Sequence, residues 1–393
     1  MATAEEEARS LLDGFAATTG LSGGGEERRY LWTDAFAVCT WLGLGEVERA
    51  LALVDRVHRV LGRHRPDDKR DGWISGLSED EGAQRPTAGG LRIGKPLPEQ
   101  GPDDPYDRQL EWERDGQYFH YLTKWIRALD RTADVAGGLA DGGRYHRWAV
   151  ELGTVAFERF SHGPDGEPTG LYWKMSIDLS RPVVPSMGQH DALDGYVTLS
   201  TLRDGSRGED ATDLRSTLDE AAAAALDGAI DRLAAMVEGT ELATNDPLGA
   251  GSLLTDASLL ARITEPDQPR RLQILERVLE AAERSLTTVR RSRLLELPAT
   301  QRLAFRELGL ALGLEAVARL AADGPGGGDR LPAVATHAEA MAGAAHMGKT
   351  IREFWLEPEH RRAPTWADHQ DINTVMLAAS LAPDGYLGGT GGD

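Results

Sequence analysis

The sequence has 393 residues, of which 41% are hydrophobic and 27% are charged, as in a globular protein that can bury a large core. Its formal charge of −20 argues against nucleic acid or an anionic membrane surface as a partner, because both repel an acidic protein. Its single cysteine, Cys39, excludes an internal disulfide. The N-terminus MATAEEEARS is unlike a signal peptide and no apolar run is long enough to cross a bilayer, so we expect a cytoplasmic protein.

Hydrophobic periodicity predicts helices along almost the whole chain, and these helices alternate between two kinds. Helices with charges on one face are typical of an outer layer, whereas helices that are apolar on all sides are typical of a buried layer. We predict outer helices near residues 3–17, 46–62, 142–161, 213–238, 270–290 and 332–346. We predict inner helices near residues 31–43, 113–131, 189–203, 247–262, 302–319 and 366–382.

Six helices of each kind in alternation predict an all-α fold, the (α/α)6 barrel, in which an outer ring of helices covers an inner ring. No shorter repeat is visible, so we expect one domain over residues 1–393. Three long links, residues 63–112, 162–188 and 347–365, precede inner helices, and such segments are often functional. We therefore expect the site at the N-terminal ends of the inner helices, with a short strand or hairpin arm in GLYWKMSIDLS, residues 170–180, at its mouth.

The third inner helix begins with QHDALD, residues 189–194, which places acid and base groups where a helix starts. Asp191 can act on a ligand or merely cap the helix. His190 and Asp194 are four residues apart and so share a helix face. A carboxylate beside a histidine orients the ring and raises its basicity, which suits general acid–base catalysis near neutral pH. Asp115, near the start of the second inner helix, is a further candidate for a catalytic carboxylate.

Other inner helices also begin with aromatic, acidic or histidine side chains, and the long links add basic and aromatic ones. Tryptophan rings can stack on the apolar faces of sugars or anchor a lid. No two histidines have the spacing of a metal site, and no phosphate-binding loop is visible, so we expect neither metal nor other cofactor. The expected substrate-binding residues are Trp32, Asp34, Arg92, Glu113, His120, Trp173, Lys174, Asp178, Trp366 and Asp371.

Twelve alternating helices with aromatic and acid–base residues at the inner starts resemble the six-hairpin (α/α)6 barrels, and among them the N-acylglucosamine 2-epimerase family. The stretch GQHDALDGYV is similar to that family's Gly-His-x-x-Glu-Trp segment, with His190 on the histidine. His369, at the start of the last inner helix, matches the family's late histidine. The resemblance implies an epimerase or aldose–ketose isomerase that uses His190 and His369 as acid and base, with a small carbohydrate as its substrate.

Two other functions stay open from the sequence. An inverting glycoside hydrolase or unsaturated-uronide hydrolase needs two carboxylates that flank the scissile bond, and Glu113, Asp115, Asp178, Asp191 and Asp194 are the candidates. A non-catalytic carbohydrate-binding barrel needs the tryptophans without a convergent group of histidines and carboxylates. The sequence does not indicate an oligomeric state.

Overall fold

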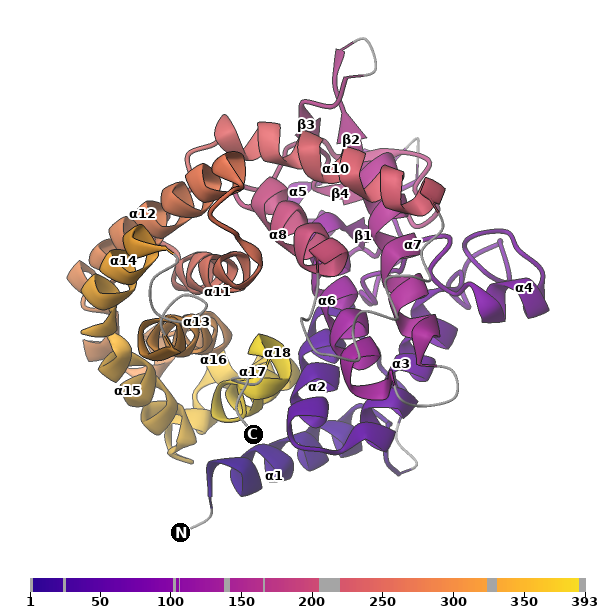
Figure 1. Cartoon of the computed structure of the whole chain (residues 1–393). Coiled ribbons are helices and arrows are strands. Elements are labelled where there is room, and N and C mark those ends of the chain that lie inside the picture. The colour runs from indigo at the N-terminus through magenta and orange to yellow at the C-terminus, as the bar shows by residue number, and fades with distance from the viewer. Residues whose placement is uncertain are drawn as a thin grey trace. The chain divides into compact units, whose positions relative to one another are not determined.

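A computed structural model describes residues 3–23, 26–101, 104–105, 107–137, 142–164, 167–204, 220–323 and 331–388 (Figure 1). In these residues the fold is predominantly helical with a few short strands, which confirms the predicted all-α class. The contacts divide the chain into two compact units. Unit 1 comprises Met1–Thr18, Gly43–Gly45 and Thr240–Asp393, and unit 2 comprises Thr19–Leu42 and Glu46–Gly239. The single-domain barrel stays a prediction.

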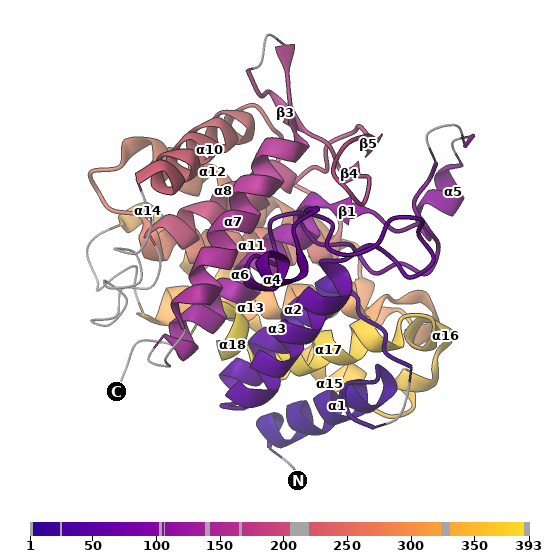
Figure 2. The same ribbon diagram turned by 90° about the vertical axis from the view of Figure 1, so that its right-hand side faces the viewer.

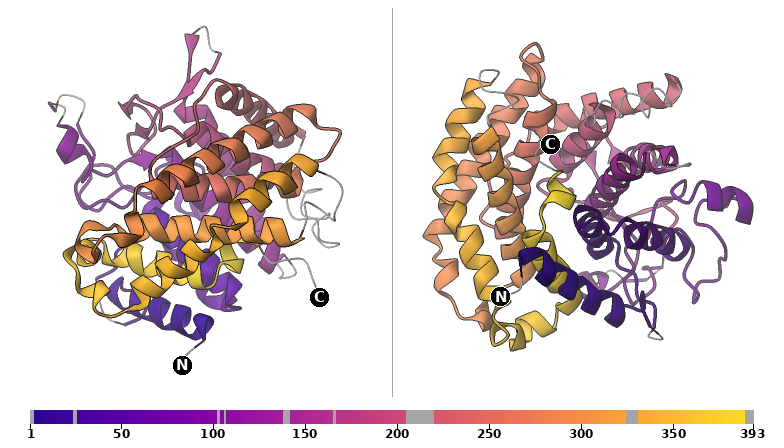
Figure 3. Two further views of the ribbon diagram at one scale, coloured as in Figure 1. Left: turned by 90° about the vertical axis from the view of Figure 1, so that its left-hand side faces the viewer. Right: turned by 60° about the horizontal axis from the view of Figure 1, so that its bottom comes forward.

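Unit 1 has two layers of helices (Figures 1 and 3). Its helices are α1 (Ala4–Thr18), α11 (Pro247–Ile263), α12 (Pro269–Arg291), α13 (Ala304–Asp323), α14 (Pro332–Ala342), α15 (Ala345–Leu356), α16 (Pro364–Ala367), α17 (Gln370–Leu381) and α18 (Asp384–Leu387). The 3-10 turns η2 (Leu294–Glu296), η3 (Ala299–Gln301) and η4 (His360–Arg362) lie between them. Helix α13 packs between α11 and α17, and the helices α12, α14, α15 and α1 cover this inner layer.

Glycines let two inner helices of unit 1 approach each other closely. A Cβ atom on Gly251 of α11 would clash with the backbone of Gly309 on α13, and one on Gly313 would clash with the backbone of Gly251. The backbones of α11 and α13 therefore touch at a distance that only glycine allows. This contact fixes how the inner layer of unit 1 packs.

Unit 2 combines helices with short strands (Figure 2). Its helices are α2 (Leu31–Gly43), α3 (Val47–Leu61), α4 (Glu79–Gln84), α5 (Arg108–Glu111), α6 (Phe119–Ala136), α7 (Gly143–Phe160), α8 (Asp191–Asp204) and α10 (Glu220–Glu238). Its strands are β1 (Gln117–Tyr118), β2 (Ser161–His162), β3 (Gly170–Leu171), β4 (Lys174–Met175) and β5 (Pro182–Val184). The antiparallel order β1-β4-β5 forms one small sheet, and β2 pairs with β3 in an antiparallel ladder.

The two predicted kinds of helix differ in burial as the sequence indicates. Every residue of α2 from Leu31 to Leu42 is buried, and in α8 the run from Asp191 to Val197 is buried. In α3, by contrast, the buried residues recur at the spacing of one helix face. Helix α6 packs on α3, α7 and α8, and α8 also packs on α10. The strand β1 directly precedes α6, and β5 lies shortly before α8, so the strands lead into the starts of inner-type helices.

Several predicted boundaries differ from the structure. Helix α6 begins at Phe119 rather than near residue 113, because Gly116 has a φ of 151° and the next two residues form β1. The helix predicted over 332–346 ends at Ala342, and most of the link 347–365 is helical as α15. The short strand or hairpin arm expected within residues 170–180 is confirmed by β4, which pairs with β5 just beyond that range. Residues 213–219 of a predicted outer helix lie outside the described part. None of the helices described is long and apolar enough to cross a membrane.

Candidate functional site

The buried carboxylate of Asp115 holds the loops of unit 2 together. It accepts hydrogen bonds from the guanidinium groups of Arg92 at 2.6 Å and Arg65 at 3.4 Å. The backbone N–H groups of Gly94, Lys95 and Gly116 also donate to it, at 2.9, 3.3 and 3.0 Å. Arg92 in turn donates to two backbone carbonyl oxygens. Asp115 and Arg92, which the sequence predicts as site residues, thus use their hydrogen-bonding groups within the protein.

Lys174 and Asp178 are held in the same way. The ammonium group of Lys174 is fully buried and donates to the side chain of Glu111 and to the backbone oxygens of Glu111 and Arg114. The carboxylate of Asp178 accepts from Ser176, Ser180 and Arg70. These contacts tie β4 and the turn that follows it to the long loop before α6.

Trp32 and Asp34 lie at the start of α2 with their side chains buried. The ring of Trp32 packs on Phe36 with 4.5 Å between ring centroids. The carboxylate of Asp34 accepts from Arg29 at 3.1 Å and from the backbone N–H of Tyr30 at 3.1 Å. In this position Asp34 anchors the segment that enters the helix.

Helices α6 and α8 bring four ionisable side chains together, which we call the acid–base cluster: His120, Lys124, Asp191 and Asp194. His120 and Lys124 are four residues apart on α6, and Asp191 and Asp194 are three apart on α8, so each pair shares a helix face. Nδ1 of His120 lies 3.9 Å from Oδ1 of Asp191. The ammonium group of Lys124 forms an ion pair with Asp194 at 3.1 Å.

The cluster leaves His120 and Asp191 poorly satisfied. Nδ1 of His120 is buried and has no hydrogen-bond partner in the described part of the chain. Asp191 is buried, and among the described residues it accepts one hydrogen bond, from the backbone N–H of Gly188 at 2.8 Å. A Cβ atom on Gly188 would meet the carboxylate at 2.6 Å, so a larger residue there would have to displace the side chain of Asp191.

Burial shifts the pKa values of these two groups in opposite directions. Removal from water raises the pKa of Asp191 to about 7, and the negative charge of Asp194 adds to the shift. Burial lowers the pKa of His120 to about 4, because its charged form is the cation; Asp194 opposes this shift and Lys124 adds to it. Between these two values the carboxyl group is protonated and the imidazole is neutral, so one group can donate a proton while its neighbour accepts one.

A row of aromatic side chains runs up to the acid–base cluster; we call it the aromatic row, Trp112, Trp173, Tyr118, Tyr121 and Tyr30. Trp173 stacks on Tyr118 with centroids 5.0 Å apart and lies nearly parallel to the ring of His120. Trp112, which is 48% exposed, meets Trp173 edge to face. The row thus extends from an exposed tryptophan to the histidine of the cluster.

The far end of the row carries hydroxyl groups and a cation. The hydroxyl groups of Tyr30 and Tyr121 are hydrogen-bonded to each other, and burial raises the pKa of Tyr30 to about 12. The ammonium group of Lys95 lies 5.5 Å from the centroid of the Tyr30 ring and, among the described residues, makes no ion pair. Burial lowers the pKa of Lys95, although the charges of Glu113 and Asp115 oppose the shift. Glu113 itself is exposed.

The remaining predicted residues lie outside this cluster. His190 immediately precedes α8, and its backbone oxygen accepts from the N–H of Asp194. His369 and Asp371 belong to unit 1, where the exposed ring of His369 meets Phe305 edge to face. Trp366 is a buried residue of α16 in the same unit. The pairing of His190 with His369 therefore stays a prediction.

In the part of the chain described, no group of three or more histidine, cysteine, aspartate or glutamate side chains has the geometry of a metal site. Comparisons with models of protein families, with curated proteins and with solved structures find no match. The chemistry of the site is therefore inferred from the geometry and charges of its own residues.

The sequence contains the signal for the acid–base cluster: it predicts Asp191 and Asp194 as catalytic residues and His120 as a substrate-binding residue. His120 and Lys124 have helical spacing, as do Asp191 and Asp194, so each pair could be placed on one face. The meeting of the two faces, and the choice of Lys124 as the partner of Asp194, depend on how α6 packs against α8. That packing is not visible in local sequence.

Proposed function

We propose that this protein is a carbohydrate-active enzyme that moves protons on a sugar, an epimerase or aldose–ketose isomerase. The observation that carries the proposal is the buried Nδ1 of His120, which lies 3.9 Å from the buried carboxyl group of Asp191. Strong shifts of neighbouring groups in opposite directions are typical of acid and base pairs in enzymes. Within unit 2, these two side chains lie beside the exposed aromatic surface that a sugar would need.

The chemistry requires a base and an acid on neighbouring atoms of the substrate. In an open-chain sugar, neutral His120 takes the proton from the carbon next to the carbonyl group, and the carboxyl of Asp191 protonates the carbonyl oxygen. The electron pair of the broken C–H bond becomes the C=C bond of an enediol. Return of a proton to the same carbon from the other face gives an epimer, and return to the neighbouring carbon gives an isomer.

The aromatic row supports a sugar as the substrate. Trp112 and Trp173 present ring surface, and the C–H groups of a sugar pack on such faces. The hydroxyl groups of Tyr30 and Tyr121 can bond to the ring hydroxyls of a ligand. The ammonium group of Lys95, which makes no ion pair within the described residues, can bind an electronegative substituent of the sugar.

A glycoside hydrolase is the second candidate, because a carboxyl with a pKa of about 7 also suits the general acid of that reaction. An inverting hydrolase needs an ionised carboxylate that activates water as well. Asp194 is the nearest carboxylate along α8, but Lys124 holds it in an ion pair. This contact occupies the carboxylate of Asp194, which favours the isomerase.

The resemblance to the N-acylglucosamine 2-epimerase family points to the same class of reaction and, with it, to an (α/α)6 barrel in the cytoplasm. In that family two histidines act as acid and base, and His190 and His369 match them in sequence. His120 and Asp191, whose side chains lie 3.9 Å apart, are the further candidates for acid and base. Substitution of each of these four residues in turn distinguishes a His190–His369 pair from a His120–Asp191 pair.

The test incubates the enzyme with free aldoses in D₂O and, separately, with aryl glycosides and unsaturated uronides. Deuterium at C2 is the expected result. His120→Asn and Asp191→Asn should each lower the exchange rate by roughly 10²–10⁴-fold. Asp227→Asn is the matched control, because Asp227 pairs with Arg203 on an exposed surface of unit 2. Release of the aglycone without exchange would favour the hydrolase, and no reaction with any substrate would contradict both.

A further inference from the structure

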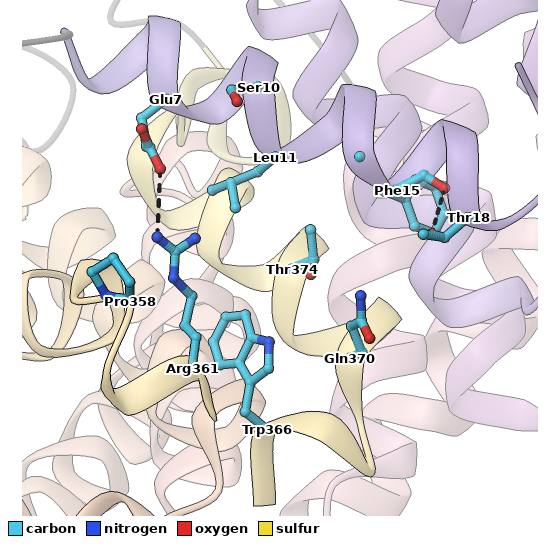
Figure 4. Close-up of a pocket in the computed structure, with 11 residues that line it drawn as sticks. Glu7, Ser10, Leu11, Phe15, Thr18, Pro358, Arg361, Trp366, Gln370 and Thr374 are labelled. Atoms are coloured by element: carbon cyan, nitrogen blue, oxygen red, sulfur yellow. Dashed lines mark hydrogen bonds and ion pairs between the residues drawn. The ribbon is translucent and has the colours of Figure 1, made fainter. Parts of the chain in front are cut away.

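Unit 1 contains a cavity that the proposed function does not use (Figure 4). Its volume is about 490 Å³, and it lies between α1 on one side and the segment from Pro358 to Thr374 on the other. The apolar part of its wall is formed by Leu11 and Phe15 of α1 with Trp366 of α16. A cavity of this size accommodates a small ligand.

The polar groups of this wall include several without partners. In the part of the chain described, the side chains of Ser10, Gln370 and Thr374 make no hydrogen bond, and neither does the indole N–H of Trp366. The nitrogen edge of the Trp366 ring lies on the side of Gln370 in Figure 4. The cavity therefore offers the N–H donor of an indole, both functions of an amide and two hydroxyl groups.

The charged groups of the cavity offset one another. Arg361 lies 3.9 Å from Glu7 across the cavity and donates a hydrogen bond to the backbone oxygen of Leu356 at 2.9 Å. One positive and one negative side chain leave the wall without net charge. A ligand with a charge of its own would gain little here, whereas the hydroxyl groups of a neutral ligand can exchange water for the polar groups of the wall.

From these observations we propose that the cavity is a binding site for a neutral polyhydroxylated ligand, a mono- or disaccharide. Such a ligand has many hydroxyl groups for the unpaired donors and acceptors, and C–H faces for Leu11 and Phe15. The site belongs to unit 1 and is independent of the acid–base cluster of unit 2. It therefore goes beyond the proposed function and does not rest on it.

Gly14 gives a way to close the cavity without disturbing the fold. It lies on α1 in the wall of the cavity, and a Cβ atom there would meet no heavy atom within 4 Å. Gly14→Leu should fill part of the space while favouring the helix, since leucine is a better helix former than glycine. Gly228→Leu is the matched control, because Gly228 is also helical with open space around it but lies on α10 of unit 2.

The experiment follows the indole N–H signals of the full-length ¹⁵N-labelled protein by NMR during titration with glucose or maltose. Trp366→Phe identifies the Trp366 signal by its loss, and the signals of Trp112 and Trp173 report on unit 2. The Trp366 signal should shift and saturate in the wild type and in Gly228→Leu. Gly14→Leu should weaken the apparent affinity tenfold or more, and Gln370→Ala should weaken it by roughly 2- to 12-fold, the effect of one hydrogen bond.

The charge of the ligand gives a second test. Glucuronate and glucose 6-phosphate should bind no more tightly than glucose, because Glu7 offsets Arg361. A Trp366 signal that does not respond to any neutral saccharide, or that responds equally in Gly14→Leu, would overturn the proposal. A response confined to Trp112 and Trp173 would also overturn it, while it would support ligand binding at the aromatic row.

Discussion

Two buried aspartates of unit 2 differ in how the protein satisfies them. Asp115 accepts hydrogen bonds from two arginines and three backbone N–H groups. Asp191 accepts one backbone hydrogen bond among the described residues and has the ring of His120 3.9 Å away. Both lie near the start of an inner-type helix, and both are acidic residues that sequence alone marks as candidates for catalysis.

The difference in hydrogen-bond donors assigns a structural role to Asp115 and a chemical role to Asp191. A buried carboxylate with several donors stays ionised and fixes the groups that bind it. A buried carboxyl with few donors and a negative neighbour retains its proton to higher pH, and it can release that proton to a substrate. The number of donors around a buried carboxylate, rather than its position in the sequence, therefore indicates its function.

Asp115→Asn should cause the largest loss of stability. The substitution leaves the buried guanidinium of Arg92 without its charged partner, and breaking a buried pair in this way costs about 3–5 kcal/mol. Urea denaturation at neutral pH measures the change. Glu113→Gln, at an exposed site two residues earlier, should change the free energy of unfolding by less than about 0.5 kcal/mol. Equal effects of the two substitutions would contradict the structural role of Asp115.

Asp191→Asn should make unfolding less dependent on pH. Because folding raises the pKa of Asp191 from 3.8 to about 7, the wild type loses stability as the pH rises through this interval. At about 1.4 kcal/mol per pKa unit, the loss amounts to a few kcal/mol. The variant lacks this titration, so its stability relative to the wild type should increase from pH 4 to pH 7. A constant difference over that interval would contradict the raised pKa.

His120→Asn should show the opposite dependence with a smaller size. Folding lowers the pKa of His120 from 6.5 to about 4, so the histidine contributes stability above pH 6.5 that is lost as the pH falls toward 4. The variant should therefore gain on the wild type as the pH is lowered over this range. Its effect is smaller than that of Asp191 because a quarter of the His120 side chain is exposed. Urea titrations at several pH values measure it, and a variant that gains stability relative to the wild type as the pH rises would be the contrary result.

Trp112→Ala should have the smallest effect on the fold. This residue is half exposed and touches the row mainly through Trp173, so the free energy of unfolding should fall by about 1 kcal/mol or less. If the aromatic row binds a sugar, the KM for the exchanging aldose should rise with little change in kcat. A fall in kcat with constant KM would place Trp112 outside substrate binding.

Much of the fold can be predicted from hydrophobic periodicity. Helices such as α3 and α11 end within a residue or two of the predicted bounds, because their buried faces repeat at helical spacing. The helix α15 was predicted as part of a link, although Met347, Ile351 and Trp355 have the spacing of a buried face. Such short amphipathic helices are easily assigned to loops when glycines and prolines flank them.

The candidate site was less predictable than the helices. The sequence indicates that Asp115 and Asp191 stand near helix starts, but it does not indicate which donors reach each of them. Arg65 and Arg92 come from a loop 23 or more residues before Asp115, and only the folded loop aims them at it. The spacing between charged residues therefore predicts a helix face well and a tertiary ion pair poorly.

The most direct test of the central claim is a titration of the Asp191 carboxyl carbon by ¹³C NMR, with Asp191→Asn used to assign its signal. We predict a midpoint near pH 7, well above the value of 3.8 for an aspartate in water. In Asp194→Asn the midpoint should move down, because the negative neighbour is removed. A midpoint near pH 4 in the wild type would contradict the assignment of Asp191 as the acid of the site.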